Sequence, residues 1–165
     1  MDAVEFKSID QRPTILWIGC SDARVAETNV IPGTEIFVQR NVANQFSASD
    51  PNTAACVAFV LNLPSVKEII VVGHTHCGGV KACFDTAKGD PPGLHPHLLK
   101  WLEPLQRLAN SLVTPGTPLQ TVIKANVVQQ MANVRAFLTT LPLEGRQIAV
   151  KGAIYDIENE RLDYV

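Results

Sequence analysis

Two thiols and one imidazole stand at points of this sequence where a fold can bring them together. Cys20 ends the apolar segment "TILWIGC" (14–20), and His74 ends the apolar segment "EIIVVGH" (68–74), with Cys77 three positions later. Thiolate sulfur and imidazole nitrogen are ligands that zinc prefers, and three protein ligands leave a fourth tetrahedral position open, as in catalytic sites. The alternative is a buried cysteine, a loop histidine and a cysteine at a helix start that never meet.

The elements around these residues predict that they do meet. Strands are predicted at 14–20, 34–40, 68–74 and 147–156. Helices are predicted at 51–63, at 118–138 and, more weakly, at 94–112, where Pro104 is expected to break or kink the helix. This alternation predicts an α/β fold with a mostly parallel central sheet flanked by helices.

The edge of such a sheet is where the candidate ligands are expected. The carboxyl ends of parallel strands lie along one edge, where open α/β folds bind their ligands, so Cys20 and His74 should be neighbours there. Cys77 should stand at the start of the next helix, where the helix dipole favours a thiolate.

Composition places limits on the class of protein. The 165 residues are 46% hydrophobic and 18% charged, which predicts one globular domain spanning 1–165. A net charge of -2 and the lack of a basic run argue against nucleic-acid or membrane-surface partners, and no apolar stretch is long enough to span a bilayer. The polar N-terminus predicts no export leader, so a cytoplasmic location is expected, with the four cysteines serving metal binding or burial rather than disulfides.

Three separated motifs resemble one known family. "CSDAR" (20–24), "RNVAN" (40–44) and "HTHCGG" (74–79), in this order and spacing, resemble the β-class carbonic anhydrases. The resemblance runs from about residue 12 to the end, and "YDIENERL" (155–162) is similar to the family's last strand. Only 13 residues precede Thr14, so the resemblance leads us to expect a short form without most of the family's N-terminal helical arm.

The resemblance implies a zinc lyase that interconverts carbon dioxide and bicarbonate. It implies one Zn²⁺ per chain on Cys20, His74 and Cys77, with a zinc-bound hydroxide that attacks carbon dioxide. Asp22 and Arg24 would form the dyad that orients this hydroxide, since Arg24 keeps the Asp22 carboxylate ionised.

The resemblance also implies finer features of the site and the assembly. The expected residues of the substrate pocket are Gly78, Gly79, Val42 and Phe46. In a closed state Asp22 would itself take the fourth zinc position, and a regulatory bicarbonate would bind at Trp17, Arg40 and Tyr155. The expected assembly is a homodimer, with a tetramer as the larger alternative.

Other functions stay open at this stage. The same motifs suit a hydrolase of a related heterocumulene, such as carbon disulfide or carbonyl sulfide. A catalytically silent zinc-binding homologue would keep its fourth position closed by Asp22, although such a site has no need of Arg24. A nucleotide-binding module is the weakest reading, because no Gly-rich phosphate loop follows the first strand.

Several further candidates are interpreted as structural. Cys56 and Cys83 are expected in apolar packing, and His76 is expected to point away from the metal. His95 and His97 lie in a Pro-rich segment and are expected to be solvated, with a proton-shuttle role as the alternative.

Overall fold

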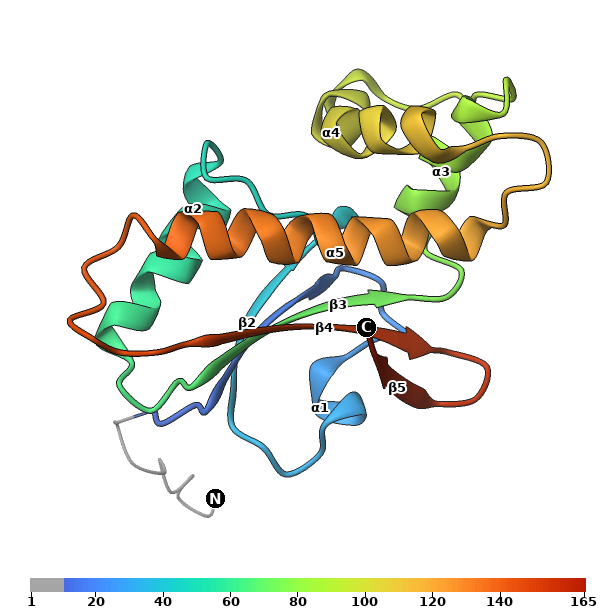
Figure 1. The fold of residues 1–165 in the computed structure, drawn as a ribbon. Coiled ribbons are helices and arrows are strands. Elements are labelled where there is room, and N and C mark those ends of the chain that lie inside the picture. Colours follow the sequence, from blue (N-terminus) through green and yellow to red (C-terminus); the bar gives the residue numbers. More distant parts are fainter. Residues whose placement is uncertain (1–10) are drawn as a thin grey trace, which may run out of the picture.

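The structure is a computed structural model that describes residues 11–165. A five-stranded sheet in the order β2-β1-β3-β4-β5 forms its centre (Figure 1). The strands are β1 (Ile15–Cys20), β2 (Ile36–Asn41), β3 (Glu68–His74), β4 (Ala149–Asp156) and β5 (Arg161–Tyr164). The first four strands run parallel and β5 pairs antiparallel with β4, so the predicted fold class is confirmed. Residues 1–10, where the sequence predicts no export leader, lie outside the described residues.

Helices connect the strands at nearly the predicted places. They are α1 (Glu27–Val30), the 3₁₀ turn η1 (Val42–Asn44), α2 (Pro51–Ala58), the 3₁₀ turn η2 (Phe59–Asn62), α3 (Gly78–Ala87), α4 (Pro96–Leu112) and α5 (Leu119–Leu138). Asp50 caps α2, because its Oδ2 accepts a hydrogen bond from the Thr53 N–H at 3.1 Å. The predicted break at Pro104 is absent, and α4 runs through it. Because proline has no backbone N–H, the carbonyl of Lys100 one turn earlier lacks its usual helical partner. Pro104 and Lys100 both lie on the exposed side of α4, so water can donate a hydrogen bond to that carbonyl instead.

The two faces of the sheet are covered unequally. Helices α2 to α5 lie over one face, and only the short α1 lies over the other (Figure 1). Leu16 and Ile18 of β1 point into the larger core under α5, whereas Trp17 points into the smaller core with Val25 and Tyr155. The apolar side chains that stay half-buried on the α1 face are Val30, Ile31, Ile36, Val38, Ile157 and Leu162.

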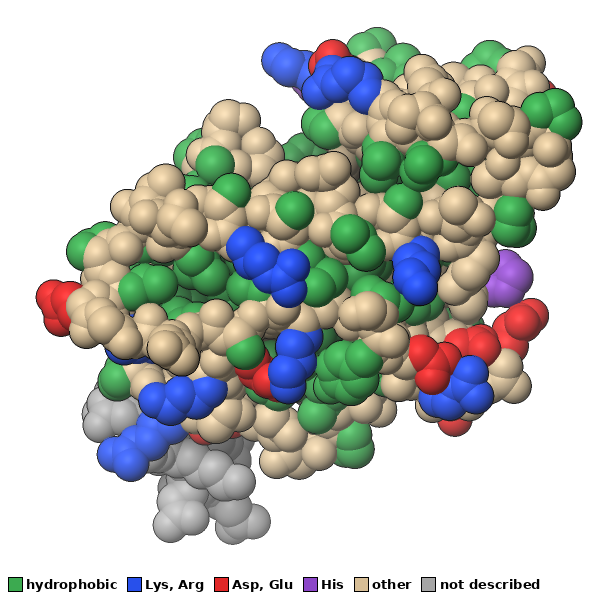
Figure 2. Space-filling model, viewed as in Figure 1, with side chains coloured by type: hydrophobic (Ala, Val, Ile, Leu, Met, Phe, Trp, Pro, Cys, Tyr) green, Lys and Arg blue, Asp and Glu red, His purple; other side chains and the backbone are tan. Residues whose placement is uncertain are grey.

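Charged side chains of both signs are present on the face shown in Figure 2. Lys and Arg side chains form small groups at the upper left and lower left of this view and are otherwise scattered among acidic and uncharged ones. Within residues 11–165, every helix is too short or too polar to cross a bilayer.

Candidate metal centre

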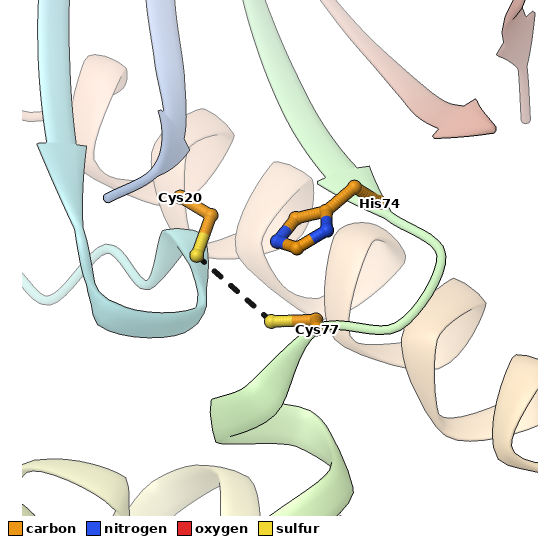
Figure 3. A group of neighbouring side chains, drawn as sticks. All are labelled: Cys20, His74 and Cys77. Carbon is orange, nitrogen blue, oxygen red and sulfur yellow. Dashed lines mark hydrogen bonds between the residues drawn. The ribbon is translucent and has the colours of Figure 1, made fainter. Parts of the chain in front are cut away.

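The fold brings the three predicted ligands together at one edge of the sheet. Cys20 is the last residue of β1, His74 is the last residue of β3, and Cys77 is the N-cap of α3. β1 and β3 are adjacent parallel strands, so their carboxyl ends lie side by side. The two Sγ atoms and a ring nitrogen of His74 all lie within 4.8 Å of one another, and all three residues are buried (Figure 3).

The geometry of these donors fits a zinc ion. Two sulfurs that each lie about 2.3 Å from a tetrahedral zinc are separated by about 3.8 Å. The Sγ atoms of Cys20 and Cys77 are 3.9 Å apart. The Nε2 atom of His74 is buried and has no hydrogen-bond partner among the described residues, as expected of a nitrogen that serves a metal.

A backbone carbonyl fixes the ring of His74. Its Nδ1 lies 2.8 Å from the carbonyl oxygen of Thr75, so Nδ1 carries the proton and Nε2 keeps its lone pair for the metal. Thr75 is itself anchored, because its N–H donates to Tyr155 O and its Oγ1 accepts from the Ile157 N–H, both at 3.0 Å. The sequence did not indicate Thr75, because its role is to accept a hydrogen bond at its backbone carbonyl, a group that every residue type carries.

The thiols of Cys20 and Cys77 are joined by a hydrogen bond. The pKa of Cys20 is lowered, chiefly because Cys77 donates a hydrogen bond to its sulfur, and the pKa of Cys77 is raised because it holds that proton and is buried. The neighbouring backbone N–H groups of Asp22 and Ala43 act to lower the pKa of Cys20, and those of Val80 and Gly79 act to lower the pKa of Cys77. These donors stabilise negative charge on both sulfurs, so a divalent cation would displace the remaining proton.

An ionised carboxylate lies beside the ligand set. Asp22 Oδ1 accepts from the N–H of Arg24 at 3.0 Å and from its Nε at 2.9 Å, and Oδ2 accepts from Nη2 at 2.7 Å. These hydrogen bonds hold the pKa of the Asp22 carboxyl well below its usual range. Asp22 Oδ2 is 3.9 Å from His74 Nε2, so the charge faces the centre.

Comparisons with known proteins agree with this geometry. A profile of the carbonic anhydrase family matches residues 15–162. The chain belongs to the carbonic anhydrase family. A carbonic anhydrase of Pseudomonas aeruginosa is 33% identical over 96% of this chain and 76% of its own length. One of Candida albicans is 34% identical over 94% of this chain, which spans only 57% of that relative.

Solved structures identify the class. A β-carbonic anhydrase of Aspergillus fumigatus is 31% identical and superposes with a TM-score of 0.75, covering 94% of this chain and 76% of its own. One of Coccomyxa, in complex with acetazolamide, is 26% identical with a TM-score of 0.79, covering 94% and 72%. The chain therefore belongs to the β class of this family.

Of the three predicted regulatory residues, Arg40 contacts the backbone next to the centre. Arg40 reaches from β2 to the carbonyls of Cys20 and Asp22, with Nε–O and Nη2–O distances of 2.8 and 2.6 Å. Trp17 and Tyr155 lie together in the smaller core, and Trp17 Nε1 has no partner in the described part of the chain. In this structure Arg40 fixes the turn after β1, and bicarbonate binding at these residues stays a prediction.

The predicted pocket residues divide between two places. Gly79 packs against Val42 and Ala43, where a Cβ would lie only 3.1 Å from Val42 Cγ1, and its N–H acts to lower the pKa of Cys77. Phe46 lies in the larger core with its ring 5.4 Å from that of Phe137. It lines a groove of about 1080 Å³ between the segment 45–50, α4 and α5, and none of the metal-centre residues line this groove.

The residues interpreted as structural lie apart from the metal cluster. Burial raises the pKa of the Cys56 and Cys83 thiols to about 11, so neither is a ready nucleophile. His95 and His97 stack at the exposed start of α4 with their rings 5.2 Å apart. The His76 ring faces Glu158, with Nε2 3.4 Å from Oε1.

Proposed function

We propose that this protein catalyses the reversible hydration of carbon dioxide to bicarbonate and a proton. The observation that carries the proposal is the buried cluster of Cys20, His74 and Cys77 with the ionised Asp22 beside it. Membership of the carbonic anhydrase family supports the same reaction.

The donor set suits a zinc ion, with Cys20, His74 and Cys77 as its ligands. Zinc bound there would lower the pKa of a coordinated water to about 7 and so supply hydroxide at neutral pH. Two thiolates offset both charges of the ion and weaken this acidification, so the residues around the site must assist the reaction.

Asp22 is the residue placed to give that help. Arg24 donates two hydrogen bonds to Oδ1 and one to Oδ2, so Oδ2 keeps an unused acceptor position beside His74. Oδ2 can accept a hydrogen bond from the attacking water or hydroxide and direct its lone pair at the carbon of carbon dioxide. Orientation of this kind contributes much of the rate in an addition reaction.

The alternatives receive less support. A silent zinc protein would use Asp22 as a permanent ligand, but here both oxygens of Asp22 are bonded to Arg24. Hydrolysis of carbon disulfide or carbonyl sulfide would require the same centre, and the relatives reported above are carbonic anhydrases.

Stopped-flow hydration of carbon dioxide tests the proposal. The purified protein should accelerate hydration, a chelator that removes zinc should return the rate to that of buffer, and added zinc should restore it. Carbonyl sulfide should be turned over far more slowly than carbon dioxide. Zinc-loaded protein with no hydration activity at any pH would contradict the proposal and favour the silent alternative.

We also propose a homodimer that works in the cytosol. The α1 face leaves apolar side chains half-buried under one four-residue helix, and a second copy could cover them. Two relatives of Sordaria macrospora with solved structures are tetrameric, and all four cysteines here are free thiols, which suit a reducing compartment. Light scattering after gel filtration should give twice the chain mass, or four times for a tetramer. A mass of one chain at micromolar concentration would exclude the dimer.

A further inference from the structure

A strained turn beside Cys20 is the starting point. The turn η1 follows β2 and passes the Cys20 side chain (Figure 3). Ala43 and Asn44 have φ angles of 64° and 46°, in the left-handed region that residues with a Cβ rarely occupy. The turn packs against β1, with Ala43 and Cys20 in the same buried cluster, and the nearby N–H of Ala43 acts to lower the pKa of Cys20. Something must hold the turn in this conformation.

Two side chains from different helices hold the peptide groups on either side of Ala43. Trp101 of α4 donates its Nε1–H to the carbonyl oxygen of Val42 at 2.8 Å. That carbonyl belongs to the same planar peptide group as the N–H of Ala43, so Trp101 sets the direction of this N–H. Asn126 of α5 donates Nδ2–H to the carbonyl oxygen of Ala43 at 2.9 Å and so holds the next peptide group.

The orientation of Asn126 is itself fixed. Gln130, one turn later on α5, donates Nε2–H to Asn126 Oδ1 at 2.9 Å. Gln130 Oε1 accepts from the N–H of Phe46 at 2.9 Å and from Asn133 Nδ2 at 3.1 Å, so the Gln130 amide cannot turn over without losing both bonds. Asn126 must therefore keep its oxygen toward Gln130 and its NH₂ toward Ala43. Asn126 and Gln130 are both buried, where an unpaired amide would be costly.

We propose that Trp101 and Asn126 are positioning residues of the metal centre, which hold the turn at Ala43 against β1 with its N–H beside the sulfur of Cys20. The inference rests on the proposed role of Cys20 as a metal ligand. A hydrogen bond to a ligating sulfur fixes its position and withdraws part of its negative charge, so less charge reaches the metal. Without the two side chains, the turn would relax toward ordinary φ values and Cys20 would lose this neighbouring N–H.

Three single variants test the inference. Trp101→Phe removes the indole N–H but keeps an aromatic ring, and Asn126→Leu keeps the branched shape but removes the amide. The matched control is Gln106→Met, because Gln106 also lies on α4 and also donates to a backbone carbonyl, that of Cys83 at 3.1 Å. Each protein is loaded with cobalt(II) in place of zinc, and the thiolate-to-cobalt charge-transfer band and the rate of metal loss to a chelator are measured, together with the melting temperature.

The band should shift in Trp101→Phe and Asn126→Leu, and metal affinity should fall about tenfold, the lower end of the effect of groups that support metal ligands. Gln106→Met should change neither. If Asn126→Leu does not fold, Trp101→Phe decides alone. A lower melting temperature with an unchanged charge-transfer band and unchanged metal affinity would overturn the inference. Trp101 and Asn126 would then stabilise the fold of the turn without affecting the metal centre. If the unaltered protein binds neither cobalt nor zinc, the proposed function is contradicted together with this inference. If the unaltered protein binds metal and only the expected effects of the variants are missing, this inference alone is contradicted.

Discussion

Replacing Cys20 by serine is expected to leave the protein without zinc and without hydration activity. The serine hydroxyl does not ionise near neutral pH and is a poor ligand beside the thiolate that it replaces. Only His74 and Cys77 would remain to hold the ion. Changes in groups that merely support a metal ligand cost 10–100-fold in affinity, so the loss of a ligand should cost more than about 100-fold. Zinc per chain after dialysis, measured by elemental analysis, should fall from about one to near zero.

The same substitution at Cys83 is the control for this result. Cys83 is buried on α3, and its sulfur has only a 4.0 Å contact to the carbonyl oxygen of Leu102. Cys83→Ser should therefore retain zinc and hydration activity, although burial of its hydroxyl will lower stability. If Cys20→Ser kept a full complement of zinc, the ligand assignment would be wrong. If both variants lost zinc, unfolding rather than ligand loss would be the cause, and circular dichroism would reveal it.

The metal cluster could be predicted because its positions depend on strong local signals. β1 and β3 are continuous apolar segments, which predict buried parallel strands, and the ligands fall at their carboxyl ends. Both strands end within one residue of the predicted bounds. The start of α2 was equally predictable, because Asp50 and Pro51 satisfy the first turn of a helix in a purely local way.

The supporting turn could not be predicted, because its conformation is imposed from outside. Nothing in "RNVAN" indicates that Ala43 adopts a left-handed φ, since alanine rarely does so without help. The hydrogen bonds that hold this conformation come from Trp101 and Asn126, which lie 58 and 83 positions later than Ala43 in the chain. In the predicted helix 118–138, the apolar positions were evident, but Asn126 and Gln130 gave no sign that their amides would be buried and paired.

The role of Phe46 in the substrate pocket stays a prediction, and its packing partner is a second feature that the sequence could not predict. Phe46 lies between the "RNVAN" motif and α2, and the resemblance placed it in the substrate pocket. In the structure it packs on Phe137 from α5, a contact between residues 91 positions apart. The hydrophobic pattern of the sequence predicts which side chains are buried in a core. It does not predict which side chain Phe46 packs against, because that depends on how α5 crosses the sheet.

Replacing Asp22 by asparagine is expected to separate metal binding from catalysis. Asn has the shape of Asp, and Asp22 is not among the three clustered ligands, so zinc content should stay near one per chain. Arg24 directs two donors at the Oδ1 position, so the amide oxygen of the variant should turn there. The NH₂ group would then take the Oδ2 position beside His74, and a donor would stand where the reaction needs an acceptor.

This reversal should lower kcat/KM for carbon dioxide by roughly 100-fold, the scale of a misoriented reactant in an otherwise intact site. Stopped-flow hydration and zinc analysis on the same sample measure both quantities. Asp163→Asn is a close control, because Asp163 also pairs with an arginine two residues away, with Arg161 Nη2–Oδ2 and Nε–Oδ2 distances of 2.8 and 3.0 Å, but on the exposed β5. That variant should keep full activity. If Asp22→Asn retained more than half of the original kcat/KM with full zinc, orientation by Asp22 would be excluded, and the Asp22–Arg24 pair would only stabilise the turn after β1.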